Sequence, residues 1–170
     1  SAGDKEAQFG MGMVLSRGLE GVTQDPVQAA AWYLKAAEQG NVESQTMMGR
    51  IYRKGRGVEK DNRQGAIWYR MAAANGSGDA ALYLSVMFYV GEGVIKDIVL
   101  AHVWASVAAI NNSPKASKLV DLLRDDMTEE EALEFFEYNI LGSYNGQGMP
   151  SFMNDHAEPL EFDSGGIVYT

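Results

Sequence analysis

Bulky and small apolar residues recur along the chain at a fixed interval. Trp32, Trp68 and Trp104 are each 36 residues apart, and each stands within a run of small residues. The three runs read AAAWYLKAAEQG, GAIWYRMAAANG and LAHVWASVAAIN. A unit of this length is one supersecondary element that cannot bury its own apolar face. The pattern therefore predicts an all-α protein, a solenoid of antiparallel helix pairs whose product is a binding surface.

The residues between the tryptophans predict where each helix begins and ends. Each first helix begins near Ala7, Ser44 or Ala80 and is closed by Gly18, Gly55 or Gly91. An aspartate that can cap the second helix follows at Asp25, Asp61 and Asp97. The first loop has one extra residue, so the offset between units one and two is 37 upstream of it. Surface loops tolerate such an insertion, and the register survives.

These motifs resemble a known family. The pattern A-x-x-x-LG-x-x-Y-x-x-G-x-GV-x-x-D-x-x-x-A-x-x-W-Y-x-x-AA-x-x-G is similar to the Sel-one-like repeat, a subfamily of the tetratricopeptide repeats, and it covers roughly residues 5–125. Unit two matches best, as MMGRIYRKGRGVEKDNRQGAIWYRMAAANG. Unit three departs at Ser85, Phe88 and Asn112. The resemblance implies an α/α solenoid that helps to assemble protein complexes, without chemistry of its own.

The chain divides into a repeat region and a tail. We expect repeats at about 7–43, 44–79 and 80–115, a cap at 116–142, and an irregular tail at 143–170. The cap begins with a helix from Pro114 to Met127. Thr128 and Glu131 form a capping box for a further helix at 129–141. Glycines and prolines then break the helical period, and the last residues, 166–170, have strand propensity but no evident partner strand.

Composition narrows the classes of function. A net charge of -9 argues against general nucleic-acid binding, which relies on a basic surface. No run of 18 apolar residues is present, so no membrane-spanning segment is expected. Cysteine is absent, which excludes disulfides and thiolate metal sites. The family resemblance favours an exported or periplasmic bacterial protein.

The first helix of each pair lines the concave face of a tetratricopeptide solenoid, and this analogy assigns the partner-binding positions. They are Phe9, Met13, Ser16 and Arg17 in unit one, Thr46, Arg50, Arg53 and Lys54 in unit two, and Leu82, Val86, Tyr89 and Val90 in unit three. The face is thus basic in the middle and apolar beside it. We expect partner binding through Arg17, Arg50, Arg53, Lys54, Val86 and Tyr89.

The expected ligand is an acidic peptide or protein with an apolar anchor, because arginine suits the capture of a carboxylate. The alternative is that Arg53 and Lys54 favour the negative end of their own helix and that all four cations, including Arg17 and Arg50, are solvated. The tail combines acidic with apolar residues, among them Asp155, Glu158 and Phe162. It has the same character as the expected ligand, so self-association through the tail is a second possible function.

A hydrolase is the third alternative, but the sequence lacks the motifs that such an activity would require. The chain has no S-x-x-K, G-x-S-x-G or P-loop motif. His102 replaces alanines of the other units, which indicates a packed or half-exposed helix residue. His156 has no second histidine nearby to complete a metal site. We therefore expect no catalytic residue, metal or cofactor.

Overall fold

The computed structural model describes residues 3–19, 21–111, 113, 115–128, 162–163 and 166–167. The chain forms two compact units, Ser1–Met127 and Thr128–Thr170.

In the second unit, β1 (Phe162–Asp163) and β2 (Gly166–Ile167) pair antiparallel, so the expectation that the last stretch lacks a partner strand was wrong. The predicted helix at 129–141 and most of the predicted tail, including His156, lie outside the described residues.

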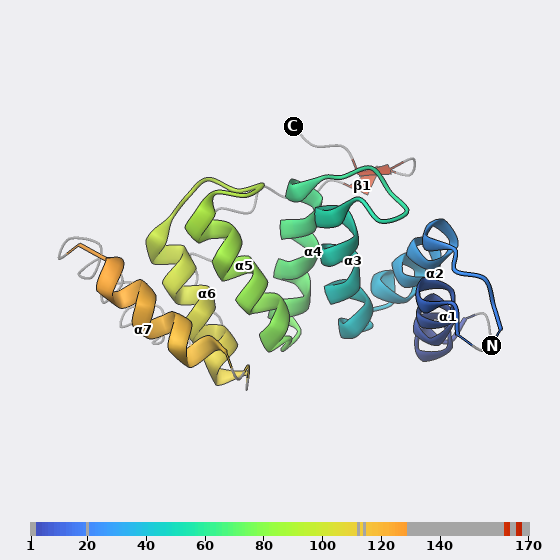
Figure 1. Cartoon of the computed structure of the whole chain (residues 1–170), viewed down its shortest axis with the longest axis horizontal. Helices are drawn as coiled ribbons and strands as arrows, with labels where there is room; N and C mark the ends of the chain where they lie inside the picture. The colour runs from blue at the N-terminus through green and yellow to red at the C-terminus, as the bar shows by residue number, and fades with distance from the viewer. Residues whose placement is uncertain are drawn as a thin grey trace. The chain divides into compact units, whose positions relative to one another are not determined.

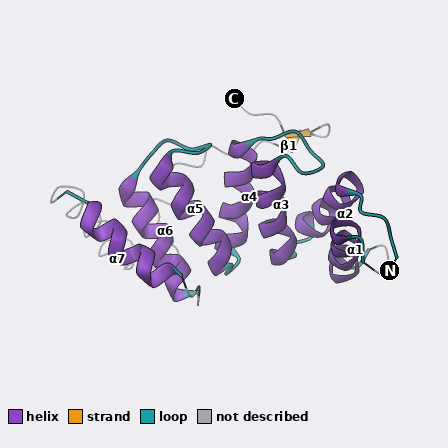
Figure 2. Ribbon diagram, in the orientation of Figure 1, coloured by secondary structure: helices purple, strands orange, loops and turns teal. Residues whose placement is uncertain are grey.

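The described part of the first unit consists of seven helices, each packed on the next one along the chain (Figures 1 and 2). They are α1 (Lys5–Arg17), α2 (Pro26–Glu38), α3 (Val42–Lys54), α4 (Asn62–Ala74), α5 (Gly78–Val90), α6 (Ile98–Ile110) and α7 (Ala116–Asp126). The first helices begin two residues before the predicted starts. The predicted solenoid of helix pairs is confirmed.

The predicted caps hold the helix ends. Asp25 accepts a hydrogen bond from the Gln28 N–H at 2.9 Å, and the equivalent aspartates cap α4 and α6. The three glycines that close the first helices, Gly18, Gly55 and Gly91, all have left-handed backbone conformation. Each cap forms hydrogen bonds with backbone groups that have no partner within the helix. Each short helix can therefore end, and the chain can reverse direction, without leaving these groups unpaired.

Alanines line the seams between helices. The side chains of Ala36, Ala37, Ala72, Ala73, Ala101, Ala105 and Ala108 are almost completely buried. Small residues let helix axes approach closely, and the larger side chains fill the remaining space. Trp68 and Trp104 are buried in this way. Trp32 is half-buried, and Lys35 Nζ lies 4.6 Å from the centroid of its ring.

A glycine of each first helix supports a tyrosine of the following helix in units one and two. Gly12 faces the ring of Tyr33, and Gly49 faces the ring of Tyr69, where a Cβ would lie 2.5 Å from the ring. Unit three has Ser85 in place of the glycine and Ala105 in place of the tyrosine. The two exchanges compensate, because removing the ring makes room for the serine. Its Oγ donates to the Ala101 carbonyl at 2.6 Å.

We expect Gly49→Ala to lower the free energy of unfolding by about 1–3 kcal/mol, because its methyl group would overlap the buried Tyr69 ring. Gly10→Ala is the matched control. It lies within α1 with open space where the added methyl group would lie, so alanine should raise stability by about 0.5–1 kcal/mol. Urea unfolding followed by circular dichroism measures both changes. A Gly49→Ala protein as stable as the Gly10→Ala protein would contradict this account.

His102 is a packed residue of α6, as the sequence comparison between units indicates. Its side chain is only 4% exposed. Burial lowers the pKa of His102 below its usual value of 6.5, and the positive charge of Arg124 on α7 lowers this pKa further. The unfolded chain therefore binds a proton at His102 more readily than the folded chain does.

This difference predicts that the contribution of His102 to stability is constant above about pH 6.5 and is lost as the pH falls from there through the folded-state pKa. His102→Ala, which restores the residue found in the other two units, should remove this part of the pH dependence. Urea unfolding of both proteins at pH 7.5, 6.5 and 5.5 tests the prediction. A stability difference between them that is the same at all three pH values would refute it.

Candidate partner-binding site

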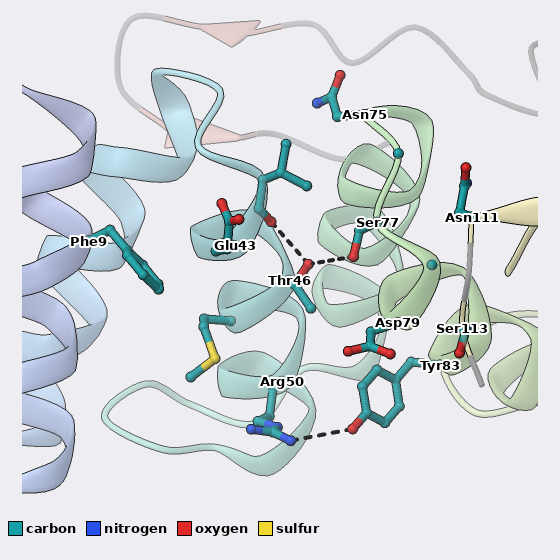
Figure 3. Close-up of a pocket in the computed structure, with 14 residues that line it drawn as sticks. Phe9, Glu43, Thr46, Arg50, Asn75, Ser77, Asp79, Tyr83, Asn111 and Ser113 are labelled. Atoms are coloured by element: carbon teal, nitrogen blue, oxygen red, sulfur yellow. Dashed lines mark hydrogen bonds between the residues drawn. The ribbon is translucent and has the colours of Figure 1, made fainter. Parts of the chain in front are cut away.

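A pocket of about 770 Å³ opens on the face formed by the first helices of units one to three (Figure 3). Its walls come from α1, from residues 42–50 of α3, from the turn between α4 and α5, from the first half of α5, and from the segment that follows α6. Phe9, Thr46 and Arg50, three of the predicted concave positions, line it. The helical phase read from the repeats therefore places these three residues at one pocket, while partner binding on this face remains a prediction.

Arg50 and Arg53 meet at one aromatic side chain, Tyr83 of α5. Arg50 Nη2 donates to Tyr83 Oη at 3.3 Å, as Figure 3 shows, and the Arg53 guanidinium lies 5.6 Å from the Tyr83 ring centroid. The Tyr83 ring also stacks on Tyr69, with 5.1 Å between centroids. Arg53 forms an ion pair with Glu92 at 3.5 Å. Arg50 is exposed, so it is the arginine that can offer its charge to a ligand.

The other predicted site residues lie outside the pocket lining. Arg17 and Lys54 are exposed in the last turns of α1 and α3. Val86 and Tyr89 of α5 are each 37% exposed. Tyr89 Oη donates to Asp126 Oδ2 on α7 at 2.9 Å, and this hydrogen bond raises the pKa of Tyr89. The predicted set is thus spread along the first-helix face, and only Arg50 belongs to the pocket.

Sequence reasoning missed two carboxylates of the pocket, Glu43 and Asp79. They occupy the same repeat position, in the first turns of α3 and α5. The expectation of a basic groove considered other positions of each first helix and left out this turn. The repeat register contained the signal, because Glu6, Glu43 and Asp79 are equivalent and all acidic. The pocket therefore carries both signs of charge.

Tyr83 was missed as well. It follows the predicted inward position Leu82 and is equivalent to Met47 of unit two, which also lines the pocket. An aromatic residue in an otherwise apolar helix gives no sequence signal that it will meet two arginines from the preceding unit. That contact depends on how closely α3 and α5 approach.

The described residues show neither a metal site nor a membrane-spanning element. Among them, no group of three or more histidine, aspartate or glutamate side chains could hold a metal ion. No helix in the same part of the chain has the length and apolar character needed to cross a membrane.

Comparison with known proteins agrees with the fold. The family model of the Sel1 repeat matches residues 5–41, 42–77 and 78–113, each starting two residues before the unit expected from sequence. A curated plant protein, the ERAD-associated E3 ubiquitin-protein ligase component HRD3A of Arabidopsis thaliana, is 34% identical over 53 residues. This match covers 31% of the present chain and only 8% of the plant protein.

Solved structures show the same architecture. The crystal structure of a Sel1 repeat protein from Oxalobacter formigenes is 30% identical with a TM-score of 0.70, over 85% of this chain and 60% of that one. Cysteine rich protein B of Helicobacter pylori has a TM-score of 0.56 at 23% identity, over 68% of this chain and 92% of that one, and supports the fold alone. Since the three consecutive matches cover residues 5–113 without a gap, which is more than half of the 170 residues, this chain belongs to the Sel1 repeat family.

Proposed function

We propose that this chain is a non-catalytic adaptor that binds a segment of a partner protein on its first-helix face. Sel1 repeat proteins are typically protein-interaction scaffolds. The plant relative is, by its name, a component of an E3 ubiquitin-protein ligase, which fits a role in assembly. A binding role also fits the architecture, because the stacked repeats of a solenoid present an extended surface to a partner.

The observation that carries the proposal is the exposed guanidinium of Arg50 in the wall of an open pocket. Its hydrogen bond to Tyr83 orients it without neutralising its charge. Phe9 and Met47 supply apolar surface in the same pocket. A carboxylate of the partner would pair with Arg50 while an apolar side chain is buried beside it, and charge-assisted hydrogen bonds of this kind are the strong ones.

The remaining predicted residues extend this surface in our proposal. Arg17 and Lys54 add positive charge at the ends of α1 and α3, and Arg53 holds Tyr83 in place through the contact between its guanidinium and the Tyr83 ring. Val86 and Tyr89 are exposed on α5 and offer apolar contact area for the anchor of the partner. An acidic segment with an apolar anchor therefore has complementary groups along α1, α3 and α5.

Selection of binders from a displayed library of random 12-residue peptides, with the full chain as bait, tests the proposal. We expect the selected peptides to share an acidic residue near an apolar one. Their affinity, measured by fluorescence anisotropy, should fall at least about tenfold for Arg50→Glu, because the variant opposes the carboxylate that the arginine attracts.

Arg63→Glu is the matched control. Arg63 is exposed on α4, outside the pocket lining, and its reversal changes the net charge of the chain equally. The control should bind the peptides as the unchanged protein does. Equal affinity for Arg50→Glu, or a selection that yields no specific peptide, would reject the groove model. Light scattering of the same preparation over a range of concentrations tests the alternative, self-association.

A further inference from the structure

Glu43 and Asp79, the acidic wall of the pocket, form no ion pair within the described part of the chain. The ion pairs among the described residues join Arg53 to Glu92 and Arg124 to Asp121, so neither Glu43 nor Asp79 takes part in one. The pKa of Arg50 is raised first by its hydrogen bond to Tyr83 and least by the charge of Asp79, and Arg50 and Asp79 form no ion pair. Both carboxylates are on exposed residues and line the pocket.

The equivalent position in unit one behaves differently. The carboxylate of Glu6 accepts hydrogen bonds from Asn41 Nδ2 at 3.1 and 3.2 Å. The residue equivalent to Asn41 in the next unit is Ser77, whose Oγ lies 3.0 Å from Thr46 Oγ1. Each turn thus places one polar side chain against the first helix of the preceding unit.

A buried hydroxyl in the same pocket repeats this position but lacks the contact. Ser113 is equivalent to Ser77, and the counterpart of Thr46 is Leu82, which has no polar group. Ser113 is only 6% exposed, it lines the pocket (Figure 3), and its Oγ has no hydrogen-bond partner among the described residues. Leaving such a buried group unpaired is unfavourable, and a ligand with a hydrogen-bonding group can remove this penalty.

These three side chains define the chemistry of a complementary group. Carboxylates only accept hydrogen bonds, and a serine hydroxyl can accept one as well. A group that meets them must carry positive charge and several N–H donors, which describes the end of a lysine or arginine side chain. The volume of about 770 Å³ is large enough for such a side chain together with its neighbours.

We propose that the pocket also recognises a basic side chain of the partner, held by Glu43, Asp79 and Ser113, while an acidic residue of the same segment pairs with Arg50. This inference rests on the proposed function and specifies its ligand. Glu43 and Arg50 are seven residues, or about 10 Å, apart along α3. In an extended segment that distance corresponds to roughly three residues, so the partner carries a basic and an acidic residue about three positions apart.

The peptides selected on the full chain provide the probe. We expect them to contain a lysine or arginine at this spacing from the acidic residue. Replacing that residue by norleucine should weaken binding to the unchanged protein about tenfold, which corresponds to one charge-assisted hydrogen bond. The same replacement should weaken binding to Asp79→Asn or Glu43→Gln by a clearly smaller factor, because each variant has lost one of the two carboxylates that hold the basic residue. This double-mutant cycle isolates the pairwise interaction.

Glu6→Gln is the matched control, since Glu6 has the same repeat position but is bonded to Asn41 and lies outside the pocket lining. It should leave peptide affinity unchanged. Ser113→Ala should weaken the lysine or arginine peptides by a smaller factor and leave the norleucine peptides unaffected. Thermal unfolding of each variant, followed by circular dichroism, verifies that the fold is intact.

The outcomes separate the two proposals. If Arg50→Glu weakens binding but the Asp79→Asn and Glu43→Gln proteins still distinguish lysine or arginine from norleucine as the unchanged protein does, the basic-residue site is wrong and the adaptor function stands. Selected peptides without any basic residue would overturn the site in the same way. A selection that yields no specific peptide overturns both.

Discussion

The close backbone approach of each repeat to the one before it is the contact on which the rest of the structure depends. Gly57 lies against Pro26, and Gly93 lies against Asn62, so closely that a Cβ would overlap the backbone. Both glycines also have a positive φ, 82° and 75°, which other residues resist. This contact and the alanine seams bring neighbouring first helices within reach of each other's side chains, as in the ion pair between Arg53 and Glu92.

The pocket arises where successive units differ. Hydrogen bonds from Gln39 to Gln8 and from Asn75 to Gln45 repeat from one unit to the next and serve the stacking of the array. The counterparts of Arg50 are Met13 and Val86, so only unit two places a cation there. A regular array would present the same surface in every unit. The cation of the pocket, Arg50, therefore comes from a position at which the units differ.

The sequence predicted the fold almost completely and the site in part. The capping aspartates and the closing glycines are local signals, and each lies at the helix end where it was expected. The tryptophan interval gave the repeat length. Helical phase also placed Arg50 in the pocket. It could not show that Arg53 is already paired with Glu92, or that Tyr89 is bonded to Asp126, because those partners are 39 and 37 residues away. Such contacts depend on the spacing between helices.

By itself, therefore, the sequence determined the repeat length, the helix pairs, their ends and the residues that share the first-helix face, since all of these follow from periodicity and local capping. The tertiary structure alone decided which charges remain available. In the folded chain Arg53 is paired with Glu92 and Arg50 is exposed. Glu43, Asp79 and the buried Ser113 line the same pocket. The physical reason is that hydrogen bonding and burial depend on distances across the repeat boundary, which no local pattern encodes.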